Sequence, residues 1–293
     1  MNLVIGVDVG GTYIKAGLVR DGKILKKIQV PSHAKKSEKE FVENINSVIS
    51  KLRVGKKVRA IGIAMAGAVD IKKGTVINSP NTPLQNFPIR EVIRKKQKLP
   101  VYMDNDASCF VLAEAIYGAG KNYNIVAGLG LGTGVGGGIV INKKLFHGRS
   151  NAGEFGHITL DMNGWVDPNG IQGGLEEYVG GRGVMRLSTR VSIVSPEHVF
   201  KLAEKGDTAA RDVWEKYGEY LGIGVANIVY AVDPEVVVIG GQISKAWKYF
   251  SYSMKKKAKQ ACFFPPPPIV RASTMSAGIL GAALICRRQA WSL

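Results

Sequence analysis

Cysteine is scarce in this chain, and long apolar runs are missing. The three cysteines, Cys109, Cys262 and Cys286, are far apart and form no CxxC pair. They indicate buried, reduced thiols rather than a disulfide framework. No apolar stretch approaches the about 18 residues that a membrane-spanning helix needs, and the first residues lack the charged region and cleavage site of a secretory signal. These absences predict a cytoplasmic protein without a membrane partner.

Acidic residues are also few, because 40 Lys and Arg stand against 23 Asp and Glu, for a formal net charge of +17. The basic residues lie in short, scattered runs such as Lys26-Lys27 and Lys255-Lys256-Lys257, without interleaved aromatics. That pattern is typical of a solvated surface, so we expect no nucleic-acid partner. The excess charge would still attract anionic substrates.

The hydrophobic pattern of the chain predicts alternating strands and helices. Strands are expected over residues 3–9, 13–20, 24–30, 60–65, 101–103 and 235–241, and helices over 38–53, 89–97, 108–117, 207–231 and 277–285. From Ile125 the pattern begins again, with about three strands up to Phe146. The sequence therefore predicts an α/β fold built from two related lobes, with a nucleotide site in a cleft between them.

A weak internal repeat supports the two lobes. IGVDVGGT at residues 5–12 and AGLGLGTG at 127–134 are both apolar alternations that end in Gly and Thr and are followed by a strand. In the first copy Asp8 stands among apolar residues, which is costly unless the carboxylate meets a cation or hydrogen-bond donors. This turn is either an anion and metal site or a plain hairpin with glycine in its turn.

The second copy leads into five glycines within seven residues, from Gly132 to Gly138. Gly132, Gly134 and Gly137 satisfy GxGxxG, but a strand follows where a dinucleotide site needs a helix. The remaining interpretations are a phosphate-binding turn, whose N–H groups face an anion, and a flexible loop. The glycine density, with Thr133 among them, favours phosphate.

Polar residues elsewhere leave alternatives open. Asp106 follows a strand and precedes a helix, where it can be a helix cap or a general base. Glu154 and His157 are three residues apart and suit either a metal or the hydroxyls of a polyol. Glu176-Glu177 can join them or simply begin a helix.

The order of these motifs carries a resemblance. DxGGTxxK, a GxxD turn at Gly67–Asp70, NDA, GTGxGGG, ExGH, GxE and VIGG occur in sequence from Asp8 to about Ala283. This set resembles the ROK (repressor, open reading frame, kinase) family of sugar kinases and regulators. The resemblance implies two actin-like (ribonuclease H-like) lobes. The N-terminal lobe would cover residues 1–107 and the C-terminal lobe 108–293, with the last helix packing back on the first lobe.

The resemblance also implies a role for each motif. Asp106 would be the catalytic base on the primary hydroxyl of the sugar, and Asp8 would hold Mg²⁺ through water. The nucleotide, ATP, would be bound by Asp8, Gly10, Gly11, Thr12, Lys15, Gly132, Thr133, Gly134, Gly240 and Gly241. The sugar would be bound by Gly67, Asn105, Asp106, Glu154, His157 and Glu176.

One segment departs from the family pattern. Many members carry a CxCGxxGCxE zinc segment, and here Asp167, Asn169 and Gly174 stand at the three cysteine positions. The soft ligands of a structural zinc are therefore lost, and we predict no zinc. Asp167 or Asn169 is then expected to hydrogen-bond the outer nitrogen of His157.

Taken together, the motifs predict an ATP-dependent kinase that makes a hexose 6-phosphate, a glucokinase or broad-specificity hexokinase. A kinase for N-acetylmannosamine or N-acetylglucosamine is the alternative. A sugar-responsive regulator of the same family is less expected, because such proteins usually carry an N-terminal helix-turn-helix and the first motif here begins at residue 8. Family resemblance suggests a dimer or tetramer.

Overall fold

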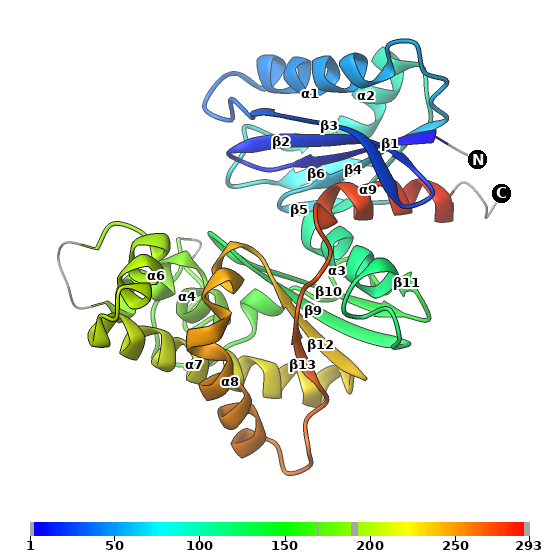
Figure 1. Cartoon of the computed structure of the whole chain (residues 1–293). Coiled ribbons are helices and arrows are strands. Elements are labelled where there is room, and N and C mark those ends of the chain that lie inside the picture. The colour runs from blue at the N-terminus through cyan, green and yellow to red at the C-terminus, as the bar shows by residue number, and fades with distance from the viewer. Residues whose placement is uncertain (1–2, 169, 189–192, 290–293) are drawn as a thin grey trace. The chain divides into compact units, whose positions relative to one another are not determined.

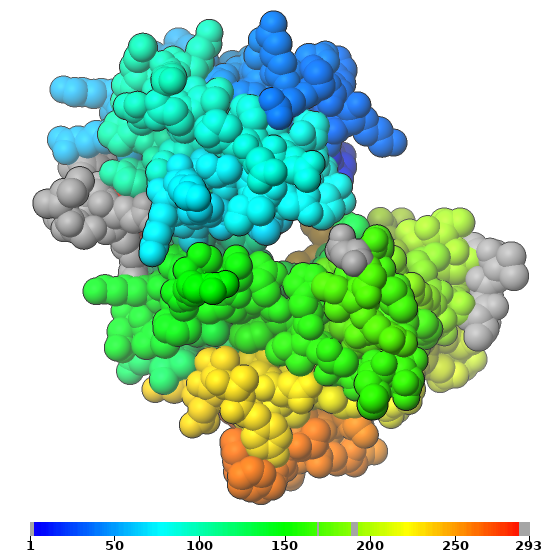
Figure 2. All heavy atoms as spheres, turned by 180° about the vertical axis from the view of Figure 1, so that it is seen from behind, coloured from blue at the N-terminus to red at the C-terminus, as the bar shows by residue number. Residues whose placement is uncertain are grey.

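The computed structural model describes residues 3–168, 170–188 and 193–289, and the chain forms two compact units (Figure 1). Unit 1 comprises Met1–Tyr117, His147–Ala152 and Thr274–Leu293, and unit 2 comprises Gly118–Phe146 and Gly153–Ser273. In Figure 2 the blue and cyan atoms of unit 1 pack into one body, and the green, yellow and orange atoms of unit 2 into another. Sequence reasoning drew the lobe boundary after residue 107, whereas the contacts keep the following helix with unit 1.

Unit 1 is built on a five-stranded sheet. Its order is β3 (Lys23–Pro31), β2 (Tyr13–Arg20), β1 (Leu3–Val9), β4 (Ala60–Met65) and β8 (Val101–Asn105). The first three strands are antiparallel neighbours, while β1, β4 and β8 run parallel. A small sheet of β5 (Ala68–Asp70), β6 (Thr75–Asn78) and β7 (Gln85–Phe87) follows β4 along the chain.

Unit 2 repeats this arrangement. Its sheet has the order β11 (Lys144–Leu145), β10 (Val135–Ile141), β9 (Ile125–Leu131), β12 (Val236–Gly240) and β13 (Ile269–Arg271). Again the first three are antiparallel neighbours and the last three run parallel. The α/β fold predicted from the sequence is confirmed, and the weak repeat of residues 5–12 and 127–134 corresponds to the central strand of each sheet.

Helices cover both faces of the first sheet. Helices α1 (Glu38–Arg53) and α2 (Ile89–Gln97) lie on one face, and α9 (Ala277–Gln289) lies on the other and packs on α3 (Asp106–Tyr117) (Figure 1). Strand β1 turns Leu3, Ile5, Val7 and Val9 toward the α1 and α2 side, where they join Phe41 and Ile45 in the core. This alternation is the period-2 pattern that predicted the strand.

Backbone packs directly on backbone beneath this sheet. A methyl group on Gly62 of β4 would lie 1.7 Å from the carbonyl oxygen of Ala282, and one on Gly6 would lie 2.1 Å from that of Ile279. From α9, a methyl group on Gly281 would lie 1.9 Å from the carbonyl oxygen of Cys109 in α3. Helix α9 therefore sits where it does because these three positions carry no side chain.

The helices of unit 2 surround its sheet. They are η1 (Phe155–His157), α4 (Leu175–Val179), α5 (Gly181–Leu187), α6 (Pro196–Glu204), α7 (Thr208–Val232), η2 (Gln242–Ala246) and α8 (Trp247–Ala261). Helices α7 and α8 approach closely because Gly218 and Gly222 of α7 face the backbone of α8. Trp214, Tyr217 and Phe250 fill the space between them with edge-on ring contacts and are almost fully buried. Within the described residues, no helix is both long and apolar enough to cross a membrane.

The tight contact beneath the first sheet leads to a stability prediction. Gly62→Ala places a methyl group against backbone that cannot move aside, so it should lower the free energy of unfolding by about 3 kcal/mol. Gly55→Ala is the matched control, because Gly55 has open space around it and only a left-handed φ of 67° to strain, worth about 1 kcal/mol. Urea unfolding of the two variants checks this, and equal effects would contradict it.

Candidate active site

Three parallel strands of unit 1 end side by side. Val9 of β1 pairs with Met65 of β4, which pairs with Asn105 at the end of β8. The residues that follow these strands therefore lie along one edge of the sheet, where α/β folds bind their ligands. Those residues include the Gly10-Gly11-Thr12 turn, Gly67, and Asp106, so the structure brings together all the site residues predicted in this half of the chain.

Asp8 occupies the end of β1 on the face covered by α9. Its cross-strand partner is Lys15, whose Nζ lies 3.8 Å from Asp8 Oδ2. Gly278 in the first turn of α9 packs against the carboxyl group, since a methyl group there would lie 2.6 Å from Asp8 Cγ. Burial raises the pKa of the Asp8 carboxyl, while the positive charges of Lys15 and Lys27 lower it. A further cation at this carboxylate would oppose the burial effect in the same way.

Hydrogen bonds and close packing with neighbouring residues fix the conformation of the first glycine turn. The Gly10 amide donates to the carbonyl oxygen of Tyr13 (3.1 Å), which closes the turn between β1 and β2. Gly11 lies against the backbone of Asn81, where a methyl group would approach the carbonyl oxygen to 2.5 Å. The Ser32 hydroxyl donates to the Gly11 carbonyl oxygen, and the Ser32 amide donates to that of Thr12 (2.9 Å). The Thr12 side chain itself is exposed.

Asn105 hydrogen-bonds both the loop after β4 and the first turn of α3. Its Nδ2 donates to the carbonyl oxygen of Gly67 (3.0 Å), and its Oδ1 accepts from the amides of Ala107 (2.8 Å) and Ser108 (3.1 Å). Gly67 has a φ of 96°, and a methyl group on it would lie 2.4 Å from the Asn78 carbonyl oxygen. Asn105 therefore caps the start of α3 and at the same time holds the loop after β4.

Asp106 is the first residue of α3 and is partly exposed. Its Oδ1 accepts from the Ala107 amide at 2.9 Å, so the carboxylate is oriented by its own helix turn. The sequence left open whether this residue is a cap or a base. Asn105 already accepts hydrogen bonds from two amides at the start of this helix. Helix capping alone therefore does not explain why position 106 is an acid.

A matching edge exists in unit 2. Gly240 of β12 pairs with Gly130 of β9, so the ends of these strands also lie side by side. Gly241 adopts a φ of 86°, and a methyl group on it would lie 2.1 Å from the carbonyl oxygen of Leu131, immediately before the Gly132-Thr133-Gly134 turn. The structure thus brings together the two glycine segments predicted to bind nucleotide.

Glu176 supports this second turn from α4. Its Oε2 accepts from the Val135 amide (2.8 Å), and a methyl group on Gly134 would collide with it at 2.3 Å. Its Oε1 accepts from Arg182, whose Nη2 lies 3.1 Å away. The Gly181 amide donates to the carbonyl oxygens of Gly132 (2.9 Å) and Thr133 (3.1 Å). The predicted sugar ligand Glu176 is therefore also a structural partner of the phosphate-sized turn.

Glycines of β10 and of the ExGH segment let the two pack closely together. A methyl group on Gly137 would lie 2.4 Å from the Gly153 carbonyl oxygen, and one on Gly153 would lie 2.7 Å from the Cα of Gly138. Gly156 in turn faces the Val135 carbonyl oxygen. Close packing thus accounts for Gly137 and Gly138, and the sequence interpretation that counted them toward a phosphate turn applies only to the first part of the run.

Glu154 and His157 lie at a short 3-10 turn near Glu176. The chain after His157 pairs with the segment before Glu176, through Leu175 N to Ile158 O and Leu160 N to Gly173 O, both at 2.8 Å. Burial and the charge of Glu176 raise the pKa of the Glu154 carboxyl, while His157 lowers it. His157 is exposed. Two acceptors and one imidazole in reach of each other suit a ligand rich in hydroxyl groups.

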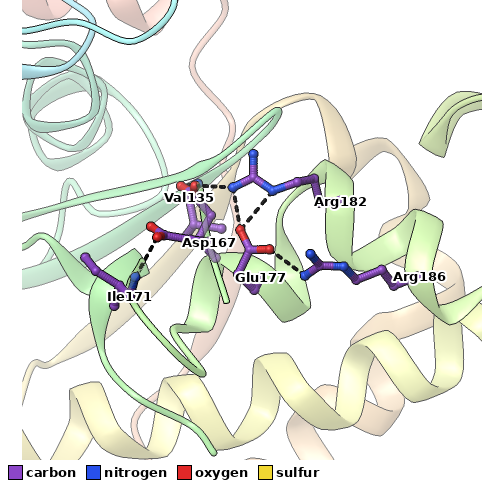
Figure 3. A network of polar contacts seen from close by, with 7 residues as sticks. Val135, Asp167, Ile171, Glu177, Arg182 and Arg186 are labelled. Carbon is purple, nitrogen blue, oxygen red and sulfur yellow. Dashed lines mark hydrogen bonds and ion pairs between the residues drawn. The ribbon is translucent and has the colours of Figure 1, made fainter. Parts of the chain in front are cut away.

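The segment that replaces the zinc motif is a hydrogen-bonded loop. Asp167 Oδ1 accepts from the Ile171 amide (2.8 Å), and the Asp167 amide donates to the Ile171 carbonyl oxygen (2.9 Å) (Figure 3). Asn169 lies outside the described residues. The expected bond from Asp167 to the outer nitrogen of His157 therefore stays a prediction, and one Asp167 oxygen is committed to its own loop.

Sequence reasoning missed the partners of Glu177 and Asp104. Arg182 and Arg186 both pair with Glu177, which is 1% exposed. His147 pairs with Asp104, also 1% exposed. Consecutive acids ahead of an arginine-containing helix were a usable signal for the first pair. The second joins residues 43 positions apart, and no local pattern shows it.

Comparison with known proteins identifies the family of the chain. The sequence model of the ROK family matches residues 4–289. A glucokinase from Thermotoga maritima is 33% identical over 98% of both chains. Two solved structures are 31% identical to this chain: a ROK hexokinase from Thermus thermophilus, covering 99% of this chain and 100% of that one with a TM-score of 0.86, and a ROK glucokinase from Streptomyces griseus in complex with glucose and AMPPNP, covering 98% and 100% with a TM-score of 0.87. The chain therefore belongs to the ROK family.

Proposed function

We propose that this protein transfers the terminal phosphoryl group of ATP to the 6-hydroxyl of a hexose, with glucose as the preferred acceptor. Its class, an ATP-dependent sugar kinase, follows from the kinase relatives that match it from end to end. The observation that carries the finer proposal is the edge of unit 1, where Asp8, the Gly10–Thr12 turn and Asp106 follow neighbouring parallel strands.

Asp106 is the general base of the proposed reaction. Phosphoryl transfer passes through a loose transition state, so the base chiefly orients the hydroxyl and accepts its proton late. Such a base must be held in place more than it must be strongly basic. The helix turn at Ala107 and the capping by Asn105 supply that fixed position.

Asp8 fits the single protein carboxylate of a magnesium–nucleotide site. Mg²⁺ keeps most of its waters and is held by one or two carboxylates together with substrate phosphates. A group of three or more His, Cys, Asp or Glu side chains poised for a metal does not occur within the described residues, and one carboxylate beside a glycine turn is what a nucleotide-borne cation requires. When bound, Mg²⁺ neutralises charge on the transferring phosphoryl group.

The glycine turns supply the remaining contacts to phosphate. Turns 10–12 and 132–134 lack side chains at the positions that would block an approach, so their amides can donate to anionic oxygens. Lys15 adds a positive charge that is one-third exposed and already oriented by Asp8. Gly240 and Gly241 adjoin the second turn and would line the adenosine.

Sugar hydroxyls are assigned to the polar side chains predicted for the sugar site. Asn105, Glu154, His157 and Glu176 offer donors and acceptors, and Gly67 leaves space beside Asn105. Carboxylates and imidazole recognise a polyol by position rather than by charge. Specificity at C2, where glucose differs from the N-acetylhexosamines, depends on how much room the site leaves for an acetamide.

An ADP-release assay across five sugars tests the proposed acceptor. We expect glucose to give the highest kcat/KM, mannose and glucosamine to be phosphorylated with lower values, and N-acetylglucosamine and N-acetylmannosamine to be the poorest. Phosphate position in the product is read by NMR. A clear preference for an N-acetylhexosamine would replace glucose in the proposal, and no turnover with any of the five would refute it.

The base is tested by Asp106→Asn. This change keeps an acceptor for the Ala107 amide but cannot take a proton, so kcat should fall by about a hundredfold or more while nucleotide affinity stays near the wild-type value. Asp212→Asn, an exposed change in α7, is the matched control. Turnover near wild type in Asp106→Asn would remove this residue from the mechanism.

The double role of Glu176 yields a different signature. Because Glu176 receives the Val135 amide next to the second turn, Glu176→Ala should raise the KM for ATP as well as that for the sugar, each by about tenfold. Exposed Glu215→Ala in α7 serves as the control. Steady-state kinetics with either substrate varied separates the outcomes, and a change confined to the sugar KM would show that the turn does not depend on Glu176.

A further inference from the structure

One short segment belongs to unit 1 although the chain on either side belongs to unit 2. His147–Ala152 is that segment, with Phe146 before it and Gly153 after it in unit 2. Gly148, Arg149, Ser150 and Asn151 are exposed. His147 joins this segment to the rest of unit 1 through a hydrogen bond to Asp104.

His147 reaches a fully buried carboxylate. Its Nε2 lies 2.8 Å from Asp104 Oδ2, while Asp104 is 1% exposed and the His147 side chain 32% exposed. A buried carboxylate is costly without donors, so this contact stabilises both partners. The hydrogen bond that His147 donates to Asp104 raises the pKa of His147 despite partial burial, which favours the charged form of the pair.

The other oxygen of Asp104 faces the catalytic end of the strand. Asp104 Oδ1 accepts from the Asn105 amide at 2.9 Å. Asn105 in turn caps α3 and holds Gly67, and Asp106 follows directly. The carboxylate that receives His147 therefore also fixes the peptide that presents the proposed base.

The segment closes on itself before it returns to unit 2. The Ala152 amide donates to the His147 carbonyl oxygen at 3.2 Å, so the chain leaves beside the residue where it entered. Glu154 follows Ala152 by two residues, a span of at most about 7 Å of extended chain. Gly153 between them packs against Gly138 of β10 with a φ of 95°, which leaves this short link little freedom.

We propose that the Asp104–His147 pair is a positioning device for sugar-binding residues: it fixes Asn105 and Asp106 of unit 1, and it restricts the chain that leads through Ala152 to Glu154. Both are positioning residues, since neither is assigned a contact with substrate. The inference rests on the proposed function, because it concerns the same sugar site. Sugar affinity is then expected to depend also on the Asp104–His147 pair, which belongs neither to the glycine turns nor to the proposed base.

The charges around His147 set its expected pH behaviour. Asp104 faces it from β8 and is the carboxylate that acts on its pKa, and Arg149 is the cation within the segment. Because the pKa of His147 is raised, the charge-assisted bond is fully present below the ordinary value of about 6.5 and weakens as pH rises through the raised value. Sugar affinity should follow the same direction.

The test compares three histidine variants in steady-state kinetics. His147→Ala should raise the sugar KM by about tenfold and change the ATP KM less than twofold. His147→Gln can still donate to Asp104, so it should recover most of the sugar affinity and lose the rise in sugar KM that the wild type shows at alkaline pH. His198→Gln, in α6 of unit 2, is the matched control and should behave as the wild type.

Amide hydrogen exchange of residues 147–152 provides a readout that does not need activity. Exchange there should be faster in His147→Ala than in wild type, and His147→Gln should restore most of the protection. Unchanged exchange, or faster exchange with a wild-type sugar KM, would overturn the positioning role. A wild-type protein that phosphorylates no sugar would refute the proposed function instead, and the exchange measurement would still decide whether His147 anchors the segment.

Discussion

The close approach of helix α9 to the central strands of unit 1 is the constraint on which this half of the molecule depends. Gly6 and Gly62 on the sheet and Gly281 on the helix let backbone lie on backbone, so no other side chains could occupy these positions without moving the helix. The first turn of α9 reaches Asp8 for the same reason, through Gly278. The helix thereby places its N-terminal dipole, which favours negative charge, beside the carboxylate that the strand buries.

The two units show how one strand order carries two different sets of residues at its strand ends. Each sheet ends its central parallel strands at one edge, followed by a glycine turn. In unit 1 that edge carries acids, Asp8 and Asp106, and a lysine. In unit 2 the corresponding edge carries glycines, and the acid nearby, Glu176, is turned onto the Val135 amide. The duplicated scaffold supplies equivalent positions, and any difference in function between the two edges must come from the residues at the strand ends.

Much of this fold could be predicted from the sequence because its elements have clean periods. The strands at 3–9 and 60–65 and the helices at 38–53 and 89–97 were predicted with the bounds that the structure has. Helix α8 was missed, since Ser, Tyr and Lys fill its sequence and its apolar face is completed by α7. The glycine run at 132–138 was interpreted only as a phosphate-binding turn. Its later glycines instead allow β10 to pack against Gly153, a long-range contact that the local sequence does not show.

The candidate site residues could be named from motifs, but the hydrogen bonds between them could not. Asn105, Asp106 and Gly67 were named separately, and only the structure shows that Asn105 bonds the Gly67 carbonyl. The long-range partner His147 has no sequence signal at all, since a histidine after a short strand is ordinary. Motifs therefore identify groups that can touch a ligand, whereas the residues that hold those groups in place come from the tertiary fold.

The loop before α4, which lacks the cysteines of the family's zinc segment, is stabilised instead by contacts among aromatic, arginine and glutamate side chains. Trp165 stacks on Tyr178 with ring centres 4.7 Å apart, and the Arg186 guanidinium lies 5.1 Å from the Trp165 ring. The same arginine pairs with buried Glu177, to which Arg182 Nε also donates at 2.8 Å (Figure 3). A buried acid with two guanidinium partners is fully paired, and the planar guanidinium both stacks and bonds. Arg182 also bonds Glu176, which accepts from the Val135 amide beside the second glycine turn. A chain of side-chain contacts therefore links this loop to that turn.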